Sequence, residues 1–205
     1  MAIIKPNNNT ISAITALPSG LTSAPGLPSG ALVHLQTTTL DSDTTQIDFS
    51  NVFSATYKSY LFVFNQLKST GTSDYFIGRF FTDTGTTAYT SSNYEIATGY
   101  ARAASGADND ASGTSWSLGY ARFAGNVFHQ NTPGSGHLYV HNPFDSGNRV
   151  TVEGHLGVHD GTYHVSAHFF GMVAANTQFY GMRFLTTSSD LGDGTSISLY
   201  GLANS

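Results

Sequence analysis

The sequence of 205 residues has no cysteine, which excludes a disulfide framework, a thiol nucleophile and a thiolate metal site. It also carries little charge, since only 10% of its residues are charged against roughly 25% in an ordinary soluble domain. The eight lysines and arginines are scattered singly and the formal net charge is −5. No basic patch forms, so we expect no nucleic-acid partner.

Long apolar runs are absent too. The longest of them, such as residues 61–64, are far too short to cross a bilayer, and the residues before Pro6 do not form a signal peptide. We therefore expect a chain that is made in a cytoplasm and does not insert into a membrane.

Known catalytic patterns are missing as well. The sequence contains no Gly-x-Ser-x-Gly elbow, P-loop, dinucleotide fingerprint or His-Glu-x-x-His motif. The glutamates are limited to Glu95 and Glu153, and nothing points to the facing pair of carboxylates that a glycosidase requires. We expect neither an enzyme nor a bound cofactor.

What the chain does contain is typical of β-structure. Serine and threonine number 24 and 25, and aromatic residues make up 13% of the chain. Aromatic and β-branched side chains suit a pleated sheet, and turn residues recur at the spacing of a sandwich or barrel. The one helix candidate is 94–104, and 107–113 reads as a polar loop. The strands that we expect are 31–36, 57–67, 75–82, 115–128, 136–141, 149–159, 162–173, 178–186 and 195–202.

These patterns predict two parts. Residues 31–205 form an all-β body, an antiparallel β-sandwich of the jelly-roll kind. Residues 1–30 hold four of the six prolines, which exclude a helix or an internal strand there. Their spaced apolar side chains favour an extended arm that docks on another surface, with a mobile tail as the alternative. The docking residues would be Ile3, Ile4, Ile11, Ile14 and Leu17.

The pair Asp160-Gly161 predicts a two-residue type I′ hairpin turn, because both of its residues tolerate positive φ. In that register His155 faces Ser166 and Glu153 faces His168. One face of the hairpin is then apolar. The other collects Thr151, Glu153, His155, His159, His164, Ser166 and His168.

Seven of the eight histidines lie between positions 129 and 168, so this face is rich in imidazole. A metal site or a pH-sensitive surface is one interpretation, with His155, His164, His168 and Glu153 as candidate ligands. Residues four apart on a strand are about 13 Å apart, which is too far for one ion. We favour an exposed polar face or a subunit interface, and expect no metal.

Aromatic residues near hydroxyl-rich loops offer a second candidate site. Trp116 could stack on a sugar ring, with Tyr100 and Tyr120 nearby as further ligand contacts. The alternative, which we favour, is that Trp116 is a half-buried strand residue.

Residues 3–18 read Ile-Ile-Lys-Pro-Asn-Asn-Asn-Thr-Ile-Ser-Ala-Ile-Thr-Ala-Leu-Pro, and residues 197–202 read Ile-Ser-Leu-Tyr-Gly-Leu. Both stretches resemble those of small structural proteins of marine tailed phages, especially cyanophages, in which an Asn-rich arm precedes a β-rich body. The resemblance implies a virion structural protein of the fibre, knob or decoration type, with no catalytic residues.

The predicted function is accordingly a non-enzymatic virion subunit, made in the host cytoplasm and anchored to other virion proteins through residues 1–30. Analogy with viral β-sandwich appendages implies a homotrimer. The alternative function is a host-receptor or carbohydrate-binding module at the tip of a tail fibre, whose partner would be a host surface glycan.

Overall fold

The structure, a computed structural model, describes residues 32–72, 74–104, 107–118, 120–128 and 132–203. The predicted arm, residues 1–30 with its five docking side chains, lies outside these residues. No helix long and apolar enough to span a membrane occurs within the described ranges.

The described residues form strands that all pair antiparallel, in two sheets. The large sheet has eight strands in the order β1-β12-β3-β8-β9-β10-β5-β6, and the small sheet has four in the order β2-β11-β4-β7. The strands are β1 Leu32–Thr39, β2 Gln46–Phe49, β3 Tyr57–Leu67, β4 Asp74–Phe81, β5 Tyr94–Ala104, β6 Ala107–Leu118, β7 Ala121–Phe128, β8 Gly134–His141, β9 Val150–His159, β10 His164–Val173, β11 Gly181–Thr186 and β12 Ser196–Ala203.

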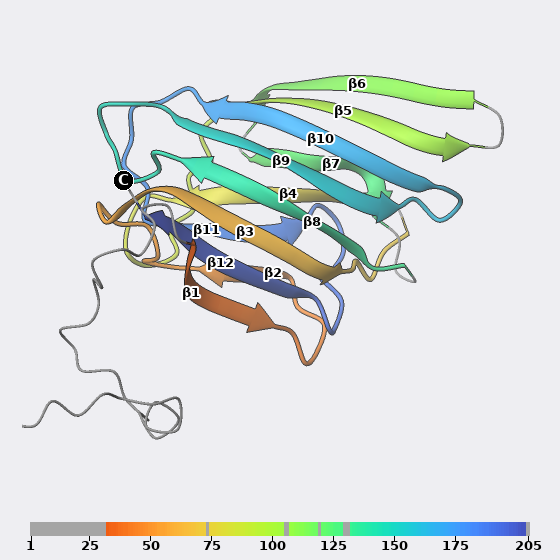
Figure 1. The fold of residues 1–205 in the computed structure, drawn as a ribbon, viewed down its shortest axis with the longest axis horizontal. Helices are drawn as coiled ribbons and strands as arrows, with labels where there is room; N and C mark the ends of the chain where they lie inside the picture. The colour runs from red at the N-terminus through yellow and green to blue at the C-terminus, as the bar shows by residue number, and fades with distance from the viewer. Residues whose placement is uncertain (1–31, 73, 105–106, 119, 129–131, 204–205) are drawn as a thin grey trace, which may run out of the picture.

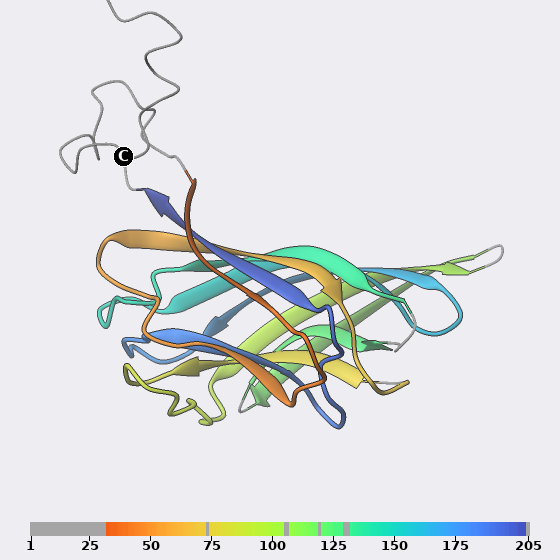
Figure 2. The ribbon, with the colours of Figure 1, turned by 90° about the horizontal axis from the view of Figure 1, so that it is seen from below.

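The strand order confirms a jelly-roll-like β-sandwich. Eight strands alternate between two four-stranded halves, β1-β12-β3-β8 and β2-β11-β4-β7, so that the first strand lies beside the last. The hairpins β5–β6 and β9–β10 are additions, and both extend the large sheet beyond β8. Figure 1 looks onto the large sheet, and Figure 2 shows the two sheets as stacked layers.

Three secondary-structure predictions were wrong, one each for a strand, a helix and a loop, and one strand was missed. The expected single strand 115–128 is two strands, because the chain leaves the large sheet after β6 and begins β7 in the small sheet. The helix candidate 94–104 is β5, in which Tyr94, Ile96 and Thr98 are buried and the residues between them are less so. The expected loop 107–113 belongs to β6, and the short strand β2 had no counterpart among the predicted elements.

The core between the sheets is built mainly from phenylalanine. Phe184 of β11 has no exposed surface, and its ring centroid lies 4.9–6.3 Å from those of five other phenylalanines. These five are Phe49, Phe62, Phe64, Phe76 and Phe123. Most of the ring pairs meet edge to face, an arrangement that adds to the free energy of burial. The core therefore fixes how the two sheets lie on each other.

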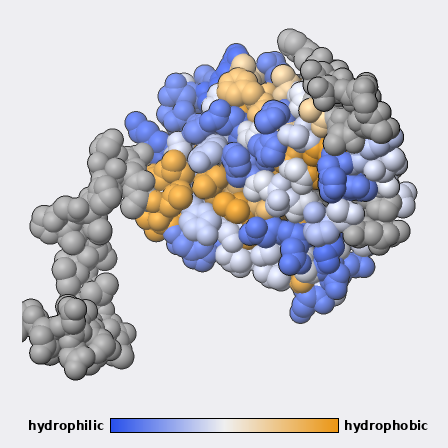
Figure 3. All heavy atoms as spheres, turned by 45° about the vertical axis from the view of Figure 1, so that its right-hand side comes forward, coloured by the Kyte–Doolittle hydropathy of each residue, from blue (hydrophilic) through white to orange (hydrophobic). Residues whose placement is uncertain are grey.

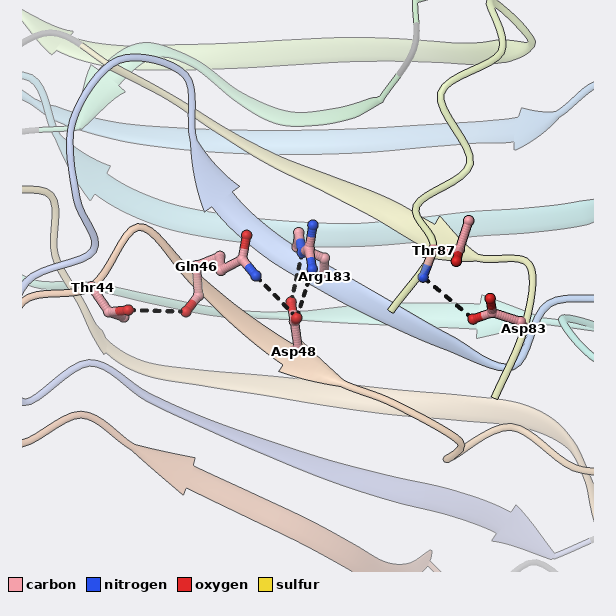
Figure 4. Close-up of polar contacts among 6 residues, drawn as sticks. All are labelled: Thr44, Gln46, Asp48, Asp83, Thr87 and Arg183. Carbon is pink, nitrogen blue, oxygen red and sulfur yellow. Dashed lines mark hydrogen bonds and ion pairs between the residues drawn. The ribbon is translucent and has the colours of Figure 1, made fainter. Parts of the chain in front are cut away.

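The outer surface of the small sheet is held by a paired charge (Figure 4). Arg183 of β11 donates from Nε and Nη2 to the two carboxylate oxygens of Asp48 on β2, both at 2.7 Å. Gln46 donates to the same carboxylate at 3.0 Å. Asp48 and Arg183 are cross-strand partners, so this two-pronged ion pair ties β2 to β11.

Truncating Phe184 to alanine should lower the free energy of unfolding by about 3–5 kcal/mol, because the five neighbouring rings would line the cavity left behind. Urea denaturation of the full chain followed by tryptophan fluorescence measures this loss. The Phe184→Leu variant keeps most of the volume and should lose clearly less. A Phe184→Ala loss of under about 1 kcal/mol would contradict this account of the core.

Candidate functional site

The candidate site lies on the outer face of the large sheet, over β8 and over β9 and β10, the two strands of an added hairpin. His137, His155 and His168 occupy one row across these strands, because His137 pairs with His155 and His155 with His168. The ring centroids are 6.3 Å apart for the first pair and 4.7 Å apart for the second. A hydroxyl joins the closer pair, since Ser166 Oγ lies 2.9 Å from His155 Nε2 and 3.5 Å from His168 Nε2.

A second row runs beside the first and consists of Tyr139, Glu153 and Phe170. The two rows line a shallow hollow of about 640 Å³. Phe170 is 56% exposed, whereas its neighbour Phe169 is 4% exposed and packs inside the sandwich. Leaving a phenylalanine in water forgoes roughly 1.5–3 kcal/mol of burial free energy, so this exposed ring is a costly feature of the surface.

Glu153 is held from one side by His141, whose Nε2 lies 3.4 Å from the Glu153 carboxylate. His141 Nδ1 in turn lies 2.8 Å from the hydroxyl of Ser59 on β3. The His141 ring also stacks on Tyr139, with centroids 6.0 Å apart and planes at 3°. These contacts orient Glu153 and Tyr139 at the edge of the hollow.

The imidazole row has its own electrostatics. Partial burial, together with the neighbouring rings of His168 and His137, lowers the pKa of His155 below its ordinary value of 6.5. His155 is therefore neutral at neutral pH, and its ring can both donate and accept a hydrogen bond.

The hairpin register predicted from Asp160-Gly161 was wrong. His155 pairs with His168 and not with Ser166, and His159 pairs with His164. The turn centres on Gly161 and Thr162, and of these two only Gly161 has positive φ, at 92°, whereas a type I′ turn needs both. The Asp160 carboxylate instead accepts hydrogen bonds from the amides of Thr162 and Tyr163.

The predicted faces of this hairpin are nevertheless those observed. A shift of two residues along a strand returns every side chain to the same side of the sheet. Val150, Val152, Leu156 and Val158 are buried, as are Val165, Ala167 and Phe169 of β10. The residues that alternate with these along β9 and β10 face outward, and they include all of the histidines of the hairpin.

The four candidate metal ligands do not converge. His155 and His168 lie together, and Glu153 is in the neighbouring row. His164 lies at the turn end of β10 against His159, with ring centroids 4.9 Å apart. Among the described residues, no group of three or more histidine, aspartate or glutamate side chains is placed to hold a metal ion.

The three candidate ligand aromatics are spread over different strands. Tyr100 lies on β5, paired with Ala167, and Trp116 lies on β6 near an irregularity in the register. Their side chains lie outside what the structure describes. Tyr120 follows β6, and its ring lies 5.9 Å from the guanidinium of Arg79 on the small sheet.

Two further carboxylates are structural. Asp74 is almost fully buried and accepts hydrogen bonds from Thr187 Oγ1 at 2.9 Å, Ser188 N at 2.9 Å and Ser188 Oγ at 2.8 Å, and also from Ser189 Oγ. Burial alone would raise the pKa of Asp74, but the hydrogen bonds from these hydroxyls outweigh it and lower the pKa. Asp83, drawn in Figure 4, accepts from the Gly85 and Thr87 amides of its own turn.

Sequence reasoning missed Tyr139 and Phe170 as members of the site. The sequence did carry a signal for Phe170. This residue lies between His168 and Met172 on the outward-facing side of β10, where an aromatic side chain is unexpected. For Tyr139 no local signal existed. Its role depends on β8 lying beside β9, and that adjacency comes from the topology.

Comparisons with known proteins found no relative of this chain. No protein family, no curated protein and no solved structure matches this chain.

The lowered pKa of His155 makes stability depend on pH. Below about pH 6.5 the unfolded chain binds a proton at this residue that the folded chain resists, so unfolding becomes easier as the pH falls. We expect the urea midpoint to fall between about pH 7.5 and pH 5, and to fall less in His155→Gln.

His34→Gln is the matched control, because it removes one histidine outside the row. Equal pH slopes for the wild type and His155→Gln would show that the row does not resist protonation. Circular dichroism during urea titration at each pH supplies the midpoints.

Proposed function

We propose that this chain is a non-enzymatic structural subunit of a tailed-phage virion, a fibre, knob or decoration protein anchored through residues 1–30. The observation that carries the proposal is the combination of a jelly-roll body with an opening sequence that resembles those of marine tailed-phage structural proteins. Neither feature alone would be specific, because the jelly roll serves many functions.

The chemistry of the described surface supports a structural role. The carboxylates of Asp74 and Asp48 are engaged by protein donors, which suits them to holding strands together. Within the described residues, the candidate metal ligands do not form a group that could hold an ion. A polar, charge-poor sandwich of this kind suits a subunit that packs against copies of itself.

The edge of the large sheet supports assembly. Among the described residues β1 pairs only with β12, so its other edge is open to a further strand. Leu32 and Val33 at the start of β1 are 54% and 38% exposed, which places apolar surface at this edge. We propose a homotrimer, by analogy with viral β-sandwich appendages.

A second function, a host-receptor or carbohydrate-binding module, is favoured by the hollow beside Phe170 on the outer sheet face. The two functions are compatible, because a fibre subunit can also carry a receptor-binding surface.

Immunogold labelling tests the virion proposal directly. Antibody raised against residues 31–205 should label purified virus particles from the source of the sequence. Label on the capsid would favour a head fibre or decoration protein, and label on the tail would favour a tail fibre. Absence of label from every particle would overturn the proposal.

Removal of residues 1–30 tests the anchor. The truncated chain should be lost from particles while its body keeps the circular dichroism spectrum and melting temperature of the full chain. The control is the full chain with Glu95→Gln, a change on β5 that leaves both residues 1–30 and the β1 edge intact and should still be incorporated. Normal incorporation of the truncated chain would contradict anchoring by this segment.

A further inference from the structure

The hollow on the outer face of the large sheet is a regular array of six side chains. Tyr139, Glu153 and Phe170 form one row, and His137, His155 and His168 form the other. Neighbouring strands are about 4.8 Å apart and same-face residues about 6.8 Å apart, so the array covers roughly 10 Å by 7 Å. This footprint and the volume of about 640 Å³ suit a ligand of one or two sugar rings.

The apolar part of the array is an exposed aromatic platform. Phe170 is 56% exposed, and Tyr139 lies in the same row two strands away. Beside His168 the row continues to Gly99, where no described atom lies within 4 Å of the position of a β-carbon. In the row of Phe170 the next position on β5 is Ala97, a small exposed side chain, so a flat ligand has room at this end of the hollow.

The polar part sits between and beside the rings. Glu153 lies between Tyr139 and Phe170, and its side chain is 53% exposed although His141 contacts it from one side. A carboxylate has about four lone-pair sites, so it can accept further hydrogen bonds. The imidazole rings of the other row add further hydrogen-bonding nitrogens within one side-chain spacing.

This combination selects among possible occupants. An anion such as phosphate would face the Glu153 carboxylate, and an apolar partner would strip water from that half-exposed charge without offering it a hydrogen bond. A metal ion would need convergent ligands, which the described histidines and acids do not provide. A pyranose satisfies both halves, because its C–H face is apolar and its hydroxyls donate and accept.

We propose that this hollow binds a neutral saccharide, with a sugar ring stacked on Phe170, hydroxyls donating to the Glu153 carboxylate and further hydroxyls bonded to the imidazoles of His137 and His168. The proposal rests on the second function proposed above, the carbohydrate-binding module, and names its ligand class and contacts. It does not require the virion role, since its contacts come from side chains of β8, β9 and β10. It also places the sugar away from Tyr120, on the opposite sheet from Arg79.

The test is carbon–proton NMR of the imidazole groups in the full chain, assigned with single His→Gln variants. The probes are maltotriose, cellotriose, mannotriose, lactose and chitotriose, each titrated to about 20 mM, which exceeds a millimolar dissociation constant. At least one probe should shift the signals of His137, His155 and His168 saturably. The signals of His34 and His164 should not move.

Variants separate binding from folding. Phe170→Ala and Glu153→Gln should each weaken binding at least tenfold, an estimate for the loss of one stacking or one charged contact. The matched controls are Leu32→Ala, an equally exposed apolar side chain on β1, and Glu95→Gln, which changes the only other glutamate. Both controls should bind as the wild type does.

Three results would overturn the proposal. The first is that no probe moves the three histidine signals, and the second is that the shifts persist in both Phe170→Ala and Glu153→Gln. The third is a fall in oligomer mass by light scattering in Phe170→Ala without any saccharide response, which would make the face an interface between copies. Immunogold labelling of particles is independent of all three, so the virion role can stand or fall separately.

Discussion

The packing of phenylalanine rings between the two sheets is the interaction on which the rest of the structure depends. With few charges and no disulfide, the chain has this apolar layer as its main source of stability. Phe184 contacts rings from both sheets and so sets their separation and angle. Strands such as β9 and β10 commit one face to this layer, so their opposite face is left for polar groups. Figure 3 shows hydrophilic and hydrophobic side chains mixed on one side of the molecule.

The sandwich class and the faces of β9 and β10 could be predicted from the sequence, because alternation of apolar and polar residues reports directly on burial. The geometry of the turn could not be predicted in this way, because the Asp160-Gly161 pair fits two turn geometries. The observed turn is the one in which the Asp160 carboxylate accepts hydrogen bonds from two backbone amides. The change of sheet between β6 and β7 was also hidden, because both stretches read as strand.

The candidate site, like the fold, could be predicted only in part from the sequence. The enrichment of histidine on one face of a hairpin was visible from spacing alone, and His155 and His168 do lie together. The part that His137 and Tyr139 of β8 play in the site was not visible from the sequence. The whole topology decides which strands are neighbours, and no local pattern reports it. The hollow also belongs to the additions to the jelly roll: two of its three strands are the inserted hairpin β9–β10, so the eight-stranded framework could exist without it.

The position of β12 has a consequence for how the chain is made. This strand lies between β1 and β3, and the hydroxyls of Thr39 on β1 and Ser196 on β12, 157 residues apart, are hydrogen-bonded to each other. Until residues 196–203 have left the ribosome, β1 has no partner among the described strands and β3 lacks its partner on one side. The large sheet therefore closes only after β12 has been made, and until then the growing chain holds open strand edges that favour aggregation.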